Sequence, residues 1–79
     1  MAYIGGWDVE LKMKLKEVLI QKGMSQKELI IKTGLRPNAI SEMANNSRQT
    51  INRKQVAKVI KALGVNDLNE LFVLVDEEQ

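Results

Sequence analysis

The chain has 79 residues, of which 44% are apolar and 28% charged, and it contains neither Cys nor His. A chain of this length supports one domain with one small core. Without Cys and His there are no disulfides, thiol nucleophiles or imidazole bases, and most zinc sites are excluded. We therefore expect no enzyme, no metal site, no cofactor and no small-molecule substrate. No apolar run approaches the ~20 residues that span a membrane, and the N-terminus lacks the features of a signal peptide, so we expect a cytoplasmic protein.

Charge is unevenly distributed along the chain. The net charge is +2, but every Lys and Arg lies at or before Lys61, and three of the ten acidic residues lie in the last four positions. Without residues 76–79 the net charge rises to +5. A moderately basic body with an acidic tail is typical of nucleic-acid binding, although solvated helix surfaces give the same pattern. We divide the chain into an N-terminal arm at 1–7, a domain at 8–75 and an acidic tail at 76–79.

The first predicted elements follow the arm. Apolar and charged residues alternate from Val9 to Leu15, which is the period of a strand, and the spacing becomes helical after Leu15. We predict a short strand at about 8–12 and a helix at about 14–22 that ends at Gly23. The alternative is a single helix that begins at Asp8.

The stretch from Ser25 to Met43 predicts two short helices joined by a tight turn. Ser25 and Glu28 have the spacing of a capping box, and Gly34 stands where a left-handed residue ends a helix. Pro37 begins a second helix, where its missing N–H has no cost. The predicted helices lie at 26–33 and 37–44.

The second of these helices has a narrow apolar edge. Ile40 and Met43 lie three residues apart and mark its buried side. The rest of its surface is polar: Asn38, Ser41, Glu42 and Asn45. A short helix with this distribution is typical of one that presents its outer face to a partner.

The C-terminal third predicts two further helices and a strand. Asn52 is predicted to cap a helix, with Gln55 three residues on as its capping-box partner, and this helix ends at Gly64. Its apolar stripe consists of Val56, Val59, Ile60 and Leu63. Asn66 or Asp67 is expected to cap a fifth helix of one to two turns that contains Leu68 and Leu71. The apolar run Leu71 to Val75 is predicted to pair as a strand with Val9 to Met13, which would satisfy both segments.

The order of these features resembles the lambda-repressor/Cro family of helix-turn-helix DNA-binding domains. The residues that match are Gln26, Leu29, Gly34, Leu35, Ile40 and Met43, followed by NRKQVAKVIKALGV and NDLNELF. The resemblance covers roughly Lys14 to Phe72. It implies an all-α, five-helix domain, to which the terminal strand pair would be added. Three residues depart from the pattern of the family. Ile30 stands where the family prefers a small residue, and Arg36 stands where a Ser or Thr cap is usual. Glu42 places an acid on the face that is expected to meet DNA.

The resemblance also implies which residues contact DNA. The helix at 37–44 would lie in the major groove and present Arg36, Pro37, Asn38, Ser41 and Glu42 to the bases. Phosphate contacts would come from Gln26 at the start of the preceding helix and from Asn45, Ser47 and Arg48 beyond the third helix. The alternative is that these polar residues are merely exposed to solvent, and that Asn38 is a second capping residue at the start of its helix.

Two functions are consistent with this pattern. The first is a sequence-specific transcription regulator, a repressor that binds double-stranded DNA as a homodimer. The alternative is a protein-interaction module of the antitoxin or anti-repressor type, which Glu42 and the lack of basic residues on the third helix favour.

Overall fold

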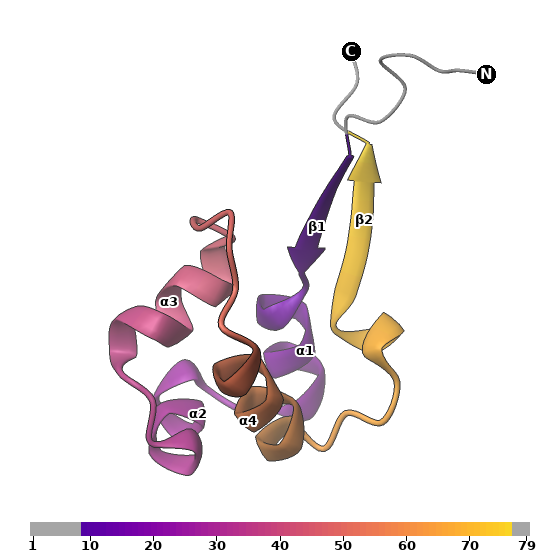
Figure 1. Ribbon diagram of the computed structural model, residues 1–79. Coiled ribbons are helices and arrows are strands. Elements are labelled where there is room, and N and C mark those ends of the chain that lie inside the picture. Colours follow the sequence, from indigo (N-terminus) through magenta and orange to yellow (C-terminus); the bar gives the residue numbers. More distant parts are fainter. Residues whose placement is uncertain (1–8, 77–79) are drawn as a thin grey trace, which may run out of the picture.

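The computed structural model describes residues 9–76. Seven elements follow one another along these residues: β1 (Val9–Met13), α1 (Leu15–Lys22), α2 (Gln26–Thr33), α3 (Pro37–Asn45), α4 (Arg53–Leu63), the 3-10 turn η1 (Leu68–Glu70) and β2 (Phe72–Asp76). The predicted arm at 1–7 and residues 77–79 of the predicted acidic tail lie outside the described residues. The four helices form one cluster, and the two strands rise from it side by side (Figure 1).

The two strands form an antiparallel pair. Val9 lies opposite Asp76, and Met13 lies opposite Phe72. The predicted strand near the N-terminus and its partner near the C-terminus are therefore confirmed, and the alternative of one helix from Asp8 is wrong. The alternation of apolar and charged residues in β1 favours a strand because it places apolar side chains on one face only.

The prediction of an all-α, five-helix class is wrong. The described residues contain four α-helices and a two-stranded sheet, and the segment predicted as the fifth helix is a single 3-10 turn. Asp67 does cap this turn, because its side chain accepts a hydrogen bond from the Asn69 N–H at 3.0 Å. The Leu71 carbonyl already accepts from the Lys14 N–H at 2.6 Å, so the chain enters the strand pair before a second helical turn can form.

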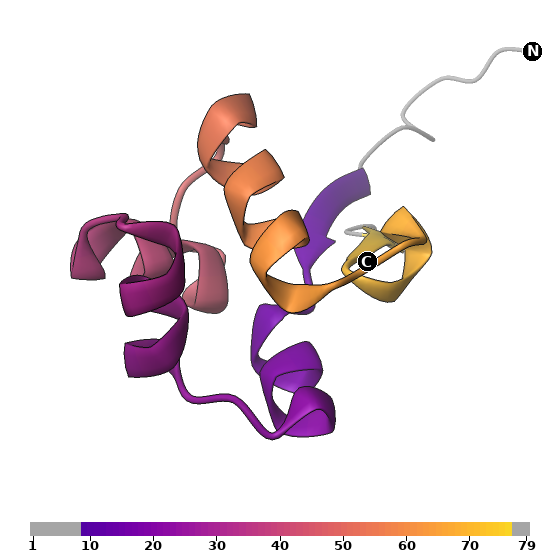
Figure 2. The ribbon, with the colours of Figure 1, turned by 90° about the horizontal axis from the view of Figure 1, so that it is seen from below.

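The core lies where the four helices meet the base of the strand pair. Leu15, Leu29, Ile40, Val59 and Leu71 are fully buried, one from each helix and one from the residue before β2. The view from below shows α1 and α4 between the strand pair and the helices α2 and α3 (Figure 2). The predicted buried side of α3 is confirmed, and in the predicted stripe of α4 Val56, Val59 and Leu63 are buried while Ile60 is half-buried.

Asn46 connects the end of α3 to the end of β1. It has a left-handed conformation, with φ of 53°, and it follows the last helical residue of α3. Its side-chain Oδ1 accepts from the Met13 N–H at 2.8 Å, and its Nδ2 donates to the Met13 carbonyl at 3.0 Å. One amide therefore satisfies both backbone groups of a residue 33 positions away, and it fixes the position of α3 relative to the sheet.

We expect Asn46→Gly to lower the free energy of unfolding by about 1–3 kcal/mol, because two partly buried backbone groups lose their partner. Glycine keeps the left-handed conformation, so the loss reports the hydrogen bonds rather than backbone strain. Urea denaturation is the measurement, with Asn45→Ala as the control, since the Asn45 side chain is exposed. If Asn46→Gly is as stable as the parent, the two hydrogen bonds to Met13 do not contribute to the free energy of unfolding as expected.

Candidate nucleic-acid interface

The N-terminus of α2 is a capped helix end with an exposed outer side. The Ser25 Oγ accepts from the Glu28 N–H at 3.0 Å, and the Glu28 Oε1 accepts from the Ser25 N–H at 2.8 Å. This confirms the predicted capping box. Gln26, the first helical residue, is half-buried. The partial positive charge of a helix N-terminus favours anions, so a phosphate can approach Gln26 here.

The turn between α2 and α3 is held by the end of α2. Gly34 has φ of 73°, which an L-residue with a side chain rarely adopts, and its N–H donates to the Ile30 carbonyl at 2.8 Å. The Thr33 hydroxyl donates to the Leu29 carbonyl at 2.8 Å and accepts from the Leu35 N–H at 3.2 Å. These bonds set the direction in which the chain enters α3.

The exposed side of α3 carries the residues predicted to contact bases. Pro37 occupies the first turn and Arg36 caps it with extended backbone, but the Arg36 side chain makes no capping hydrogen bond. Ile40, Met43 and Ala44 face the core. Arg36, Pro37, Asn38 and Asn45 are exposed, while Ser41 and Glu42 are half-buried. The helix therefore presents a mainly polar surface to solvent.

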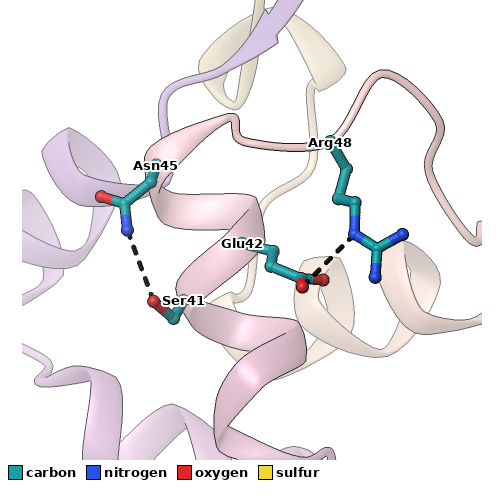
Figure 3. A network of polar contacts seen from close by, with 4 residues as sticks. All are labelled: Ser41, Glu42, Asn45 and Arg48. Carbon is teal, nitrogen blue, oxygen red and sulfur yellow. Dashed lines mark hydrogen bonds and ion pairs between the residues drawn. The ribbon is translucent and has the colours of Figure 1, made fainter.

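Two polar contacts organise the outer surface of α3 (Figure 3). The Asn45 Nδ2 lies 3.4 Å from the Ser41 Oγ. The Arg48 Nε lies 3.3 Å from the Glu42 Oε2, with the side chains 67% and 38% exposed, respectively. The ion pair is formed through Nε, and one terminal nitrogen of Arg48 lies on the side away from the carboxylate (Figure 3). Glu42 thus neutralises and orients Arg48, and it leaves the outer edge of the guanidinium free for a phosphate or a base.

A polar groove of about 390 Å³ runs between α3 and the start of α4. The residues that line it are Arg36, Asn38, Ala39, Glu42, Arg48, Thr50, Asn52 and Gln55. Four of the predicted site residues, Arg36, Asn38, Glu42 and Arg48, therefore meet in one place. Gln26, Pro37, Ser41, Asn45 and Ser47 do not line this groove.

Four lining residues were not predicted as site residues: Ala39, Thr50, Asn52 and Gln55. Asn52 was assigned only its cap, and that role is confirmed, since its Oδ1 accepts from the Lys54 N–H at 3.0 Å and from the Gln55 N–H at 3.2 Å. Thr50 and Gln55 lie in the loop and in the first turn of α4. Their polarity was the only local signal, because the turn at Asn46 that directs this loop back along α3 depends on a distant contact.

Residues 9–76 contain no group of three or more acidic side chains that could hold a metal ion. Over the same stretch, no helix has both the length and the apolar character needed to cross a membrane.

Comparison with known protein families decides the relationship. A model of the Cro/C1-type helix-turn-helix DNA-binding domain matches residues 14–77, which is most of the chain. The chain belongs to the Cro/C1-type family of DNA-binding domains. Neither the curated proteins nor the solved structures gave a match to it.

The match accounts for the arrangement of α2 and α3. In a Cro/C1-type domain these two helices form the helix-turn-helix, and here Ser25, Gly34 and Pro37 set its boundaries. The family match also begins at residue 14 and so includes β2 but not β1. This Cro/C1-type chain therefore places one strand before the matched region against another inside it.

We expect Glu42→Gln to raise the affinity for random duplex DNA and to steepen its salt dependence. The substitution removes an acid near phosphate and frees Arg48, which adds about one released counterion to the slope. Arg48→Gln should have the opposite effect, because it leaves Glu42 unpaired. Fluorescence anisotropy over a salt series measures both quantities.

Folding should not confound this comparison. An exposed ion pair is worth about 0–1 kcal/mol, so both variants should melt close to the parent. If Glu42→Gln and the parent show the same salt slope, Arg48 is not within reach of the DNA.

Proposed function

We propose that this Cro/C1-type domain is a sequence-specific transcription regulator that places α3 in the major groove of operator DNA. The observation that carries the proposal is the exposed polar side of α3, the second helix of a helix-turn-helix whose first helix begins at the Ser25 capping box. B-DNA's major groove admits one helix and displays a distinct donor and acceptor pattern for each base pair. Docked helices of this motif present their N-terminal residues to the bases.

The residues take different roles in this complex. Asn38 is exposed in the first turn of α3, and its amide can bond to both N6 and N7 of adenine. Pro37 offers only apolar contact, for example to a thymine methyl. Arg48, oriented by Glu42, reaches a phosphate or a guanine edge from beside the helix. These contacts would determine which sequence is bound.

The remaining site residues fix the domain on the sugar-phosphate backbone. Gln26 lies at the N-terminus of α2, where the helix dipole attracts phosphate. Asn45 and Ser47 are exposed at the other end of the helix-turn-helix. Arg36 and Ser41 are not phosphate contacts in this proposal, because they lie near the base edges. Phosphate contacts position the protein but carry no sequence information.

In this proposal the domain acts in the cytoplasm as a repressor. A domain that occupies operator DNA prevents the transcription machinery from using the same site. We further propose that it binds as a homodimer, because two copies related by a two-fold axis present two α3 helices to half-sites about one DNA turn apart.

One observation favours a second function, a protein-interaction module of the antitoxin or anti-repressor type. Helix α3, residues Pro37–Asn45, contains an acid at Glu42 and no Lys or Arg. On this hypothesis the outer side of α3 contacts a basic protein partner, and the groove between α3 and α4 accepts its side chains.

The effects of Asn38→Ala and Gln26→Ala separate base contacts from phosphate contacts. Operators selected from a random duplex library provide the ligand. Asn38→Ala should lose about 1–3 kcal/mol of discrimination at one or two base pairs and leave non-specific binding nearly unchanged. Gln26→Ala should weaken binding to all sequences alike, without a change in salt slope, because Gln26 is uncharged.

The same assay decides between the two functions. If neither the parent nor Glu42→Gln binds any duplex at low salt, the DNA-binding proposal fails and the protein-interaction module remains. If both bind DNA but Asn38→Ala changes no base preference, α3 does not contact bases through Asn38.

A further inference from the structure

The outermost row of side chains on α3 has an ion pair at its centre. Asn38, Glu42 and Asn45 are separated by four and three residues, so they follow one another on the side of the helix opposite its buried side. A molecule that docks along this side meets Glu42 in the middle, together with the Arg48 side chain bound to it. Among residues 9–76 this is the only ion pair.

The turn after α3 brings Arg48 back beside the helix. The Ser47 N–H donates to the Glu42 carbonyl at 3.1 Å, and Asn46 between them has a left-handed conformation. This is the pattern of a Schellman helix end, which reverses the chain within two residues. Arg48 is therefore positioned twice, through its backbone by this turn and through its guanidinium by Glu42.

The ion pair leaves one set of donors on Arg48 free. The contact is formed by Nε, which lies 3.3 Å from the Glu42 Oε2 (Figure 3). A guanidinium can bind a ligand with Nε and one terminal nitrogen, or with its two terminal nitrogens. Glu42 occupies the first arrangement. The terminal nitrogens donate to no other group within residues 9–76, and the side chain is 67% exposed. Arg48 is thus prepared for a ligand with two adjacent acceptors.

Charge decides which ligand fits this arrangement. A guanine offers O6 and N7 in the major groove, and a phosphate offers two oxygens. A phosphate about 4 Å from the guanidinium would lie roughly 7 Å from the Glu42 carboxylate. Because the Coulomb energy falls with the inverse of distance, the repulsion then cancels about half of the attraction. Guanine carries no net charge, so Glu42 imposes no such penalty. The ion pair therefore favours guanine over a phosphate.

We propose that Arg48 binds O6 and N7 of one guanine in the major groove, and that Glu42 is its positioning residue. Adenine, thymine and cytosine do not present two adjacent acceptors there, so only a guanine satisfies both terminal nitrogens. This inference rests on the proposed function and names one base that the domain recognises. It also extends the base contacts beyond α3, to a residue in the loop that follows it.

The test removes one acceptor from the DNA at a time. Operator duplexes selected from a random library with the full chain are the ligand. Each guanine in turn is replaced by 7-deazaguanine, which lacks N7 but keeps the base pair and the phosphates. At one guanine for each bound domain, the parent should lose about tenfold in affinity. Arg48→Gln should lose nothing further at that guanine, because the contact is already absent. Fluorescence anisotropy measures each affinity.

Two further variants isolate the role of the ion pair. Arg53→Gln is the matched control, because Arg53 is an exposed arginine at the start of α4 and has no ion pair within residues 9–76. It removes the same charge and should keep the tenfold loss. Glu42→Ala should reduce the loss to less than about threefold. It should also raise the affinity for random duplex DNA, because the unpaired Arg48 can turn to a phosphate. A merely structural role of Glu42 would not change these two quantities in opposite directions.

Three results would overturn the inference: a parent that tolerates 7-deazaguanine at every guanine of its operator, an Arg48→Gln variant with the same loss as the parent, or a Glu42→Ala variant that keeps the full loss. A neutral methylphosphonate at one position that weakens the parent but not Arg48→Gln would also overturn it, since Arg48 would then contact a phosphate. A library that yields no operator overturns the proposed function together with this inference. An operator without a sensitive guanine overturns this inference alone.

Discussion

The hydrogen bonds between Asn46 and Met13 are the contact on which the rest of the structure depends most. Through them, the side chain at the end of α3 binds both backbone groups of the last residue of β1. The other end of α3 is set by the turn at Gly34. A helix of nine residues that is held at both ends and buried along Ile40 and Met43 has little freedom to rotate. The side chains on its outer surface are consequently presented in one orientation.

Much of the helical part of the fold could be predicted because its signals are local. Ser25 and Glu28 are three residues apart, and Pro37 and Asn52 act on the helices that they begin. Each of these signals concerns hydrogen bonds within one turn, so the neighbouring residues suffice to recognise it. The strand at Val9–Met13 could also be predicted, since its alternation reflects a buried and an open face.

The features that could not be predicted are those that depend on distant residues. Nothing near Asn46 in the chain reveals its partner at Met13, 33 residues away. The fifth helix was expected from Asp67 and Leu68, but the bond from Lys14 to Leu71 commits the chain to a strand. In the candidate site, Glu42 and Arg48 were each expected to contact DNA on their own. Their pairing follows from the turn at Asn46, which brings the loop back beside α3.

The ion pair with Arg48 changes the electrostatic effect of Glu42 on the surface of α3. An isolated carboxylate near phosphates opposes binding at every sequence, whereas a paired one contributes no net charge and fixes the direction of a guanidinium. Affinity for the DNA backbone then has to come from the basic residues around the helix, and the net charge of +2 for the whole chain makes this contribution modest. In the proposed complex, this arrangement would favour contacts that depend on the bases over general attraction to nucleic acid.

The closed edge at Met13 also limits how far the protein can assemble. A two-stranded sheet with two open edges is a repeating unit, because each added copy offers a new edge to the next, and such growth leads to fibres. Here the Asn46 amide takes up the backbone groups of Met13 at the base of β1, so that part of the edge offers no open backbone groups to another strand. The side chain that holds the end of α3 in place thereby also shortens the open edge of the strand pair.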